Sequence, residues 1–478
     1  IGAELITYSS KSGNTLSGLS RGASGTTAAI HSSGAQVIDA ATYAGFGAAP
    51  SGDIITAPGL WSLDNFGNKL IATIFSGESF TWDADDANAV TTRAAIASGA
   101  PTASRDMLVS TPDRHLVFFG TETTIGTKST QDQMFIRFSD QEDITSYTPT
   151  ANNTAGTQRL ADGSRIMGAL RGRNAIYVWT DTALFLMRFV GAPFTFAFEQ
   201  VGTNCGLIGK NAAVEVDGTV YWMSENGFFR YGGQLESLPC LVEDFVFDDL
   251  NTVTKQHVNA GLNNLFGEIN WFYVSSGANT VNRVVTYNYL DSTSERPVWT
   301  TGTLDRTAWS DSAIFGKPHA TQYDTSTNGS STSSTYVEGN TDGVSIYYEH
   351  ETGLNQVKEG AETAIAANIV SGDFDISLNN SGAADLRGDG EYMMRISRVI
   401  PDFLSQTGDA TVTLQLRDFP TDVEASSALG PFTVTTSTKK IDTRARARAI
   451  SLKVSNTSTS QFWKLGTFRL DINPDGRR

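Results

Sequence analysis

The feature that most constrains this chain is a series of aromatic and β-branched hairpins that recurs about every 45 residues. Residues 175–179 and 183–189 form one unit, two apolar runs joined by the short polar link Thr180-Asp181-Thr182, as in a tight hairpin. Comparable pairs of runs lie within residues 69–82, 115–138, 219–231 and 269–289. The first run of each unit begins near residue 70, 116, 175, 220 or 269, which gives spacings of 46, 59, 45 and 49 residues.

This spacing predicts a β-propeller, because propeller blades are units of four short strands that repeat at such a period. A polar turn precedes each unit, at residues 65–68, 112–114, 171–174, 216–218 and 266–268. A sixth, degenerate unit is expected over residues 309–350, with an exposed low-complexity loop at 325–335. We therefore expect a propeller-like body over residues 46–356, and packed β-sandwiches are the alternative.

The rest of the chain is also predicted to be β-rich, so that the fold class is all-β. Residues 1–45 resemble a small separate segment of two or three strands. After a change in composition near residues 356–362, residues 357–478 are expected to form a β-sandwich-like module. Its predicted strands are 374–378, 393–399, 410–416, 432–435, 447–454 and 468–472. The best helix candidate in the chain is residues 252–265.

Charge is distributed unevenly over the chain, whose net charge is −16. Residues 371–478 hold 14 Lys and Arg against 13 Asp and Glu, whereas the preceding 370 residues hold 21 against 38. An acidic body repels phosphate and does not attract nucleic acid. The excess of acid serves either solubility alone or a surface over which DNA slides without adhering.

Three arginines near the C-terminus form the strongest candidate for a binding site. Arg444, Arg446 and Arg448 alternate with alanines, so on a strand the three guanidinium groups would share one face, about 7 Å apart. Like charges at this spacing need acidic partners, and Arg can pair bidentately with carboxylates. The strand could dock on a carboxylate-rich neighbour, contact phosphates, or pair with Asp442 or Asp418 of its own module.

Motifs for catalysis, metals or cofactors are not found in the sequence. Cys205 and Cys240 lack metal or redox spacing and are expected to be free thiols. The five histidines are scattered, and no nucleophile elbow or phosphate-binding loop occurs. The cluster Asp83, Asp85 and Asp86 is expected to be a solvated turn, since calcium loops need more ligands. We therefore predict no enzyme activity, no cofactor, no metal and no membrane span.

Two segments resemble proteins of bacteriophage particles. Residues 441–456, 462–472 and the terminal Asn473-Pro-Asp-Gly-Arg-Arg478 are similar to the end of podovirus tail nozzle proteins, also described as packaged-DNA stabilisation proteins. Residues 4–16 and 21–29 are similar to a short β segment of several phage virion proteins.

The resemblance implies a structural virion protein located in the tail. It implies a homo-oligomeric ring, commonly a hexamer, that docks on the tail adaptor protein and lies near tail fibres or spikes. The ring would retain the packaged genome and then release it, with DNA passing through the channel without specific binding. The alternative is a receptor- or glycan-binding tail protein, including a glycan-degrading propeller hydrolase whose acidic residues would cleave sugars.

Overall fold

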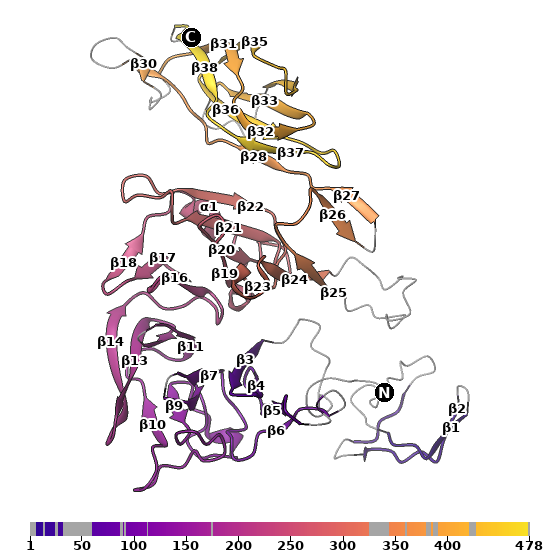
Figure 1. The fold of residues 1–478 in the computed structure, drawn as a ribbon, viewed down its shortest axis with the longest axis vertical. Coiled ribbons are helices and arrows are strands. Elements are labelled where there is room, and N and C mark those ends of the chain that lie inside the picture. Colours follow the sequence, from indigo (N-terminus) through magenta and orange to yellow (C-terminus); the bar gives the residue numbers. More distant parts are fainter. Residues whose placement is uncertain are drawn as a thin grey trace. The chain divides into compact units, whose positions relative to one another are not determined.

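The computed structural model contains two compact units, residues 1–350 and 351–478, and we describe each by itself. It describes residues 6–12, 15–23, 27–31, 60–86, 89, 92–111, 113–173, 175–324, 344–358, 361–378, 384–385, 391–419 and 427–476. The fold is all-β, as predicted, with a few short helices among the described elements (Figure 1). Residues 351–356 belong to the second unit, and the low-complexity loop 325–335 lies outside the described residues.

The first unit contains a short hairpin and then a series of antiparallel sheets in chain order (Figure 1). The hairpin is β1 (Ser10–Ser12) and β2 (Thr15–Ser17). The first three sheets are β3 (Trp61–Phe66), β4 (Lys69–Ile74), β5 (Ser79–Asp83) and β6 (Ala95–Ile96); β7 (Asp106–Ser110), β8 (His115–Phe119), β9 (Phe135–Phe138) and β10 (Gly156–Arg159); and β11 (Ile166–Arg171), β12 (Ile176–Thr180), β13 (Ala183–Gly191) and β14 (Thr195–Thr203).

The next three sheets continue the same meander. They are β15 (Ala213–Val216), β16 (Thr219–Ser224), β17 (Gly227–Tyr231) and β18 (Leu235–Leu238); β19 (Asn259–Asn263), β20 (Glu268–Tyr273), β21 (Arg283–Asn288) and β22 (Trp299–Gly302); and the three described strands β23 (Ala308–Ser310), β24 (His319–Asp324) and β25 (Val344–Glu349). The first strands of neighbouring sheets contact one another at β3–β7, β7–β11, β15–β19 and β19–β23. Closure of these sheets into a ring stays a prediction.

The predicted hairpins are present, but each four-stranded sheet begins one strand earlier than expected. The predicted polar turns fall between the first and second strands of the sheets, that is, between β3 and β4, β7 and β8, β11 and β12, β15 and β16, and β19 and β20. The first strands have a mixed composition, as in Trp-Ser-Leu-Asp-Asn-Phe of β3 and Asn-Ala-Gly-Leu-Asn of β19. These two strands lack the continuous apolar run that marks the second strands.

The central strands are buried on both faces, which explains their continuous apolar runs. On β8, Leu116 and Phe118 pack in the core toward the first sheet, whereas Val117 and Phe119 pack in the core toward the third. Alternate residues of a strand point to opposite faces, so the second sheet is packed between the first and the third. Strands buried in this way lose the apolar–polar alternation of a half-exposed sheet.

The best helix candidate of the sequence, residues 252–265, does not form an α-helix. The helix α1 spans Glu243–Asp249 instead, and residues 252–265 contain a short 3-10 turn at Lys255–His257 and the strand β19. Glu243 and Asp244 lie in the first turn of α1, where carboxylates interact favourably with the helix dipole. Val246 anchors the helix, since its side chain is fully buried in the core of the third to fifth sheets.

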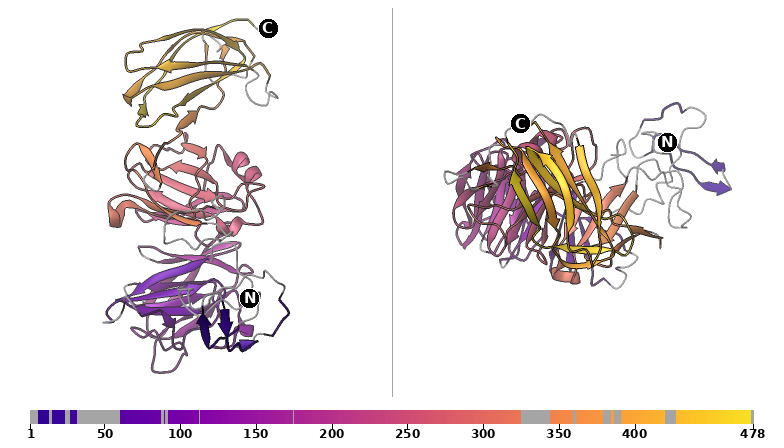
Figure 2. Two further views of the ribbon diagram at one scale, coloured as in Figure 1. Left: turned by 90° about the vertical axis from the view of Figure 1, so that its right-hand side faces the viewer. Right: turned by 90° about the horizontal axis from the view of Figure 1, so that it is seen from above.

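The second unit contains two sheets packed around one core, and the left view of Figure 2 shows its strands in two layers. One sheet has the order β28 (Asn368–Val370), β36 (Ala449–Ser455), β33 (Ala410–Arg417) and β34 (Ser427–Val434). The other has the order β35 (Ile441–Ala447), β31 (Met394–Ile400) and β38 (Arg469–Pro474). Smaller pairs are β26 (Asn355–Lys358) with β27 (Ala361–Ala364), β29 (Ser377–Leu378) with β30 (Ala384–Asp385), and β32 (Phe403–Thr407) with β37 (Phe462–Leu465).

His350, which directly follows β25 of the sixth sheet, is expected to make the stability of the first unit dependent on pH. Arg306 Nε donates to His350 Nε2 at 2.8 Å, so this nitrogen must be unprotonated. Burial, and then the nearby charge of Arg306, lower the pKa of His350 from 6.5 to about 4. Folding therefore favours the neutral imidazole. The contribution of neutral His350 to folding stability is complete above pH 6.5 and is lost as the pH falls toward 4.

We therefore expect the melting temperature of the first unit to fall between pH 6.5 and 4, and the variant His350→Gln to lose part of this dependence. Burial also lowers the pKa of His257, so His257→Gln is the matched second variant. Thermal unfolding at half-unit pH steps measures the effect. Identical pH profiles for His350→Gln and the wild type would show that His350 is not the titrating group.

Candidate assembly surface

The predicted arginine strand exists as β35, and its side chains alternate as expected. Ala445 and Ala447 are buried in the core of the second unit, whereas Arg444 and Arg446 are exposed. The strand ends at Ala447, however, so Arg448 does not share their face. Arg448 is half-buried in the link to β36, and its guanidinium donates to the carbonyl oxygen of Glu391 at 3.1 Å.

Carboxylates of the same unit pair with some cations on this face. Arg446 Nε lies 2.7 Å from Asp475 Oδ2. Asp442, one of the partners considered from sequence, instead accepts bonds from Arg398 at 3.1 Å and Lys440 at 2.8 Å. Hydrogen bonds from Lys440 and Arg398 lower the pKa of Asp442 below its ordinary value. Intramolecular pairing thus accounts for Arg446 but not for Arg444, which has no ion-pair partner in the described part of the chain.

The fold adds cations that sequence reasoning missed. Arg395 on β31 is directly paired with Arg446, and Arg469 lies on β38 opposite Ile400. An irregularity at Ser397 interrupts the alternation of β31 and brings Arg398 to the same face as Arg395, since Ile396 and Val399 are both buried. No local pattern could have revealed this set, because strands from three separate segments supply it.

We call the exposed side of β35, β31 and β38 the basic face. It contains Arg395, Arg398, Lys440, Arg444, Arg446 and Arg469, with the carboxylates Asp442, Asp471 and Asp475. Arg395, Arg444 and Arg469 are exposed and have no ion-pair partner among the described residues. Because directly opposed like charges are destabilising, the Arg395–Arg446 pair leaves this face suited to a carboxylate-rich partner.

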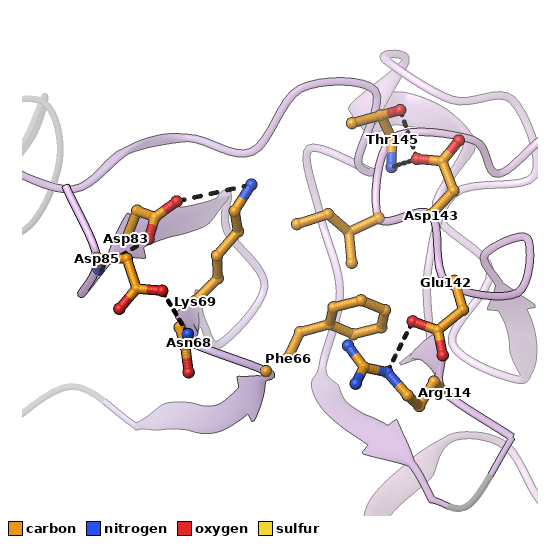
Figure 3. A pocket seen from close by; sticks show the side chains of 11 residues that line it. Phe66, Asn68, Lys69, Asp83, Asp85, Arg114, Glu142, Asp143 and Thr145 are labelled. Carbon is orange, nitrogen blue, oxygen red and sulfur yellow. Dashed lines mark hydrogen bonds and ion pairs between the residues drawn. The ribbon is translucent and has the colours of Figure 1, made fainter.

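A polar cleft of about 680 Å³ lies in the first unit, lined by turns of the first two sheets (Figure 3). Asp83 and Asp85 lie on one side of Phe66, and Glu142 and Asp143 lie on the other. Each carboxylate has a partner: Lys69, Asn68, Arg114 and Thr145, respectively. The guanidinium of Arg114 covers the ring of Phe66 at 4.9 Å, so this ring is not an open platform for a sugar.

A buried network around His115 resembles a nucleophilic triad in outline but not in chemistry. His115 Nδ1 lies 2.9 Å from Asp113 Oδ2, and Nε2 lies 3.0 Å from Thr154 Oγ1. Thr154 Oγ1 donates its proton to Asp140 Oδ1 at 2.6 Å and accepts from the backbone N–H of Gln141. A hydroxyl whose proton is held by a carboxylate is not positioned to be activated by the imidazole. The network therefore stabilises the second sheet, and the ring of His115 packs against Phe138 of this sheet and against Phe189 and Phe196 of the third sheet.

Both cysteines are at least partly buried. Cys205 and Cys240 are free thiols, as predicted, and burial raises the pKa of Cys205 to about 11 and that of Cys240 to about 12. Over the described ranges, His, Cys, Asp and Glu side chains form no group that could hold a metal ion. Among the described elements, no helix has the length and apolar character needed to cross a membrane.

Comparison with known proteins identifies no relative by sequence: no family model and no curated protein matches the chain. Solved structures that share part of the fold include the dihydro-heme d1 dehydrogenase NirN, with 10% identity, a TM-score of 0.35 and coverage of 55% of this chain and 51% of that one. Saccharomyces cerevisiae Sqt1 has 8% identity, a TM-score of 0.36 and coverage of 68% and 91%. BamB from Moraxella catarrhalis has 14% identity, a TM-score of 0.29 and coverage of 55% and 79%. The chain spans about half the length of NirN, and similarities at this level carry no functional argument.

Proposed function

We propose that this chain is a structural protein of a virus particle, a nozzle subunit at the end of a short phage tail. Its first unit would close into a propeller-like ring of sheets, and several copies, commonly six, would assemble into the wall of the DNA channel. The ring would dock on the tail adaptor, retain the packaged genome and later release it.

The observation that carries this proposal is the basic face. It includes β35, which lies in the segment that resembles the nozzle family, and three of its arginines have no described partner. Arginines presented in this way on a rigid sheet suit an assembly joint, since guanidinium groups pair with carboxylates in a defined geometry. An enzyme has less support than an assembly role. Carboxylates of the polar cleft are already paired with cations, and the Thr154 hydroxyl already donates its proton to Asp140.

Co-expression with the tail adaptor and portal proteins of a short-tailed phage tests the proposal. Negative-stain images should show rings of this chain at the far end of the adaptor. Glycan cleavage or glycan binding by the purified protein would contradict a nozzle role and favour the receptor- or glycan-binding alternative. Absence of the chain from purified tails would contradict both.

We also predict that the isolated protein does not hold duplex DNA. The first 370 residues carry 38 acidic against 21 basic side chains, and a channel wall of this sign repels phosphate, whereas a basic lining would bind DNA by counterion release. Fluorescence anisotropy with a labelled duplex at 50 and 200 mM NaCl should show no binding at micromolar protein. Micromolar affinity that falls steeply with salt would contradict the prediction.

A further inference from the structure

The arginines of the basic face fall into two groups. Some form ion pairs within the second unit, and the others have no ion-pair partner among the described residues. Arg398 contacts Asp442 at 3.1 Å and Asp471 at 3.4 Å, and Arg446 contacts Asp475 at 2.7 Å. These two therefore tie strands of the second unit together. Arg395, Arg444 and Arg469 are exposed on the same three strands with no ion-pair partner among the described residues. Their positions are set by a sheet whose other side is the core of the unit.

A complementary surface exists on the first unit of the same chain. The helix α1 carries four carboxylates and no cation in seven residues. Asp249 pairs with Arg283 at 3.1 Å, whereas Glu243, Asp244 and Asp248 have no ion-pair partner in the described ranges. Two apolar side chains beside them are exposed, Leu241 by 76% and Phe245 by 53%. Apolar groups at the centre of a contact exclude water and strengthen the ion pairs around them.

We propose that Arg395, Arg444 and Arg469 bind the carboxylates of α1 from a second copy of this chain. The inference deepens the proposed function and rests on it, since it names the joint between copies in the ring. The two surfaces differ and each copy carries both, so a head-to-tail, heterologous contact uses one surface from each of two copies. Heterologous contacts generate closed rings when the rotation between copies closes, which is the assembly that a channel wall needs.

Charge reversal on the full-length chain tests the joint. The variant Arg395→Glu, Arg444→Glu and Arg469→Glu should associate at least ten-fold more weakly than the wild type in sedimentation velocity at 150 mM NaCl. The matched control is Lys128→Glu, Arg173→Glu and Lys464→Glu, which makes the same charge change at exposed cations elsewhere and should associate like the wild type. Both variants should melt within a few degrees of the wild type, and an Arg→Gln triple variant provides a second test if the reversal impairs folding.

The reciprocal variant Glu243→Lys, Asp244→Lys and Asp248→Lys should also fail to associate alone. An equimolar mixture of the two reversed chains should recover association, because each then meets a surface of opposite charge. Recovery supports the joint, and its absence overturns the assignment to α1.

Other outcomes separate this inference from the proposed function. Rings that form normally from the arginine-reversed chain would overturn the joint and leave the nozzle proposal standing. A wild-type chain that remains monomeric at high concentration would overturn both the joint and the ring. Salt-dependent DNA binding that disappears in the arginine-reversed chain would identify the basic face as a polyanion site and likewise overturn the joint.

Discussion

Replacing Lys210 with methionine should lower the unfolding free energy of the first unit by about 3–5 kcal/mol, because it leaves a buried carboxylate without its counterion. Lys210 Nζ lies 3.2 Å from Asp106 Oδ1, and the two side chains are only 4% and 6% exposed. Lys210 also bonds to Ser62 Oγ. The pair therefore joins β3, β7 and the segment that precedes β15.

The Asp106 carboxylate accepts hydrogen bonds from three different strands. It accepts from Ser62 Oγ at 2.7 Å and from the backbone N–H groups of Met107 and Ala169 at 2.8 and 2.9 Å. These donors belong to β3, β7 and β11, the first strands of three successive sheets. The carboxylate thus holds the sheets in register, and the ammonium group compensates its charge.

A double-mutant cycle measures the coupling free energy between Lys210 and Asp106. Asp106→Leu alone should also be strongly destabilising, but the double variant Lys210→Met with Asp106→Leu should cost less than the sum of these two single changes, since an apolar pair needs no counterion. Tryptophan fluorescence during urea unfolding reports on the first unit, which contains seven of the eight tryptophans.

The matched control for the cycle is the exposed pair Arg188–Glu199, 2.7 Å apart with 48% and 61% of the side chains exposed. Arg188→Met should change stability by less than about 1 kcal/mol. A Lys210→Met variant as stable as this control would show that the buried pair does not hold the sheets.

Truncation of Trp222 to alanine is expected to cost about 3–5 kcal/mol, as for other large aromatic side chains removed from a core. Trp222 is fully buried on β16 and packs against Trp179 and Phe229, with ring centroids 5.5 and 5.7 Å away. Its indole Nε1 donates to the carbonyl oxygen of Cys205 at 2.8 Å. The side chain therefore links the third sheet, the fourth sheet and the segment between them.

Trp222→Phe separates packing from hydrogen bonding. It keeps an aromatic ring but leaves the Cys205 carbonyl without the indole donor, so we expect a loss of about 1–3 kcal/mol. Phe194→Ala is the control, since Phe194 is 77% exposed and should change stability by about 0.5 kcal/mol or less. Calorimetric unfolding of Trp222→Ala, Trp222→Phe and Phe194→Ala measures the order of their stabilities. A Trp222→Ala variant that melts like Phe194→Ala would contradict a core role for the indole.

Local patterns determined much of the fold. Trp179, Trp222 and Trp271 each occupy the fourth position of their strands, β12, β16 and β20, and all three are fully buried. The repeated apolar runs around them predicted the hairpins because a strand buried on both faces needs apolar residues at every position. The alternation of β35 likewise predicted that Arg444 and Arg446 are exposed and that the alanines between them face the core, since side chains on a strand alternate between faces.

Tertiary structure alone decided the rest. Ser62 of β3 and Asp106 of β7 carry no apolar signal, because such polar side chains become buried only when partners from other sheets satisfy them. Arg395, Arg398 and Arg469 joined the basic face through pairing of β31 with β35 and β38. Their charges are isolated in the sequence, and the basic face exists because long-range strand pairing brings them to one side of a sheet whose other side is apolar.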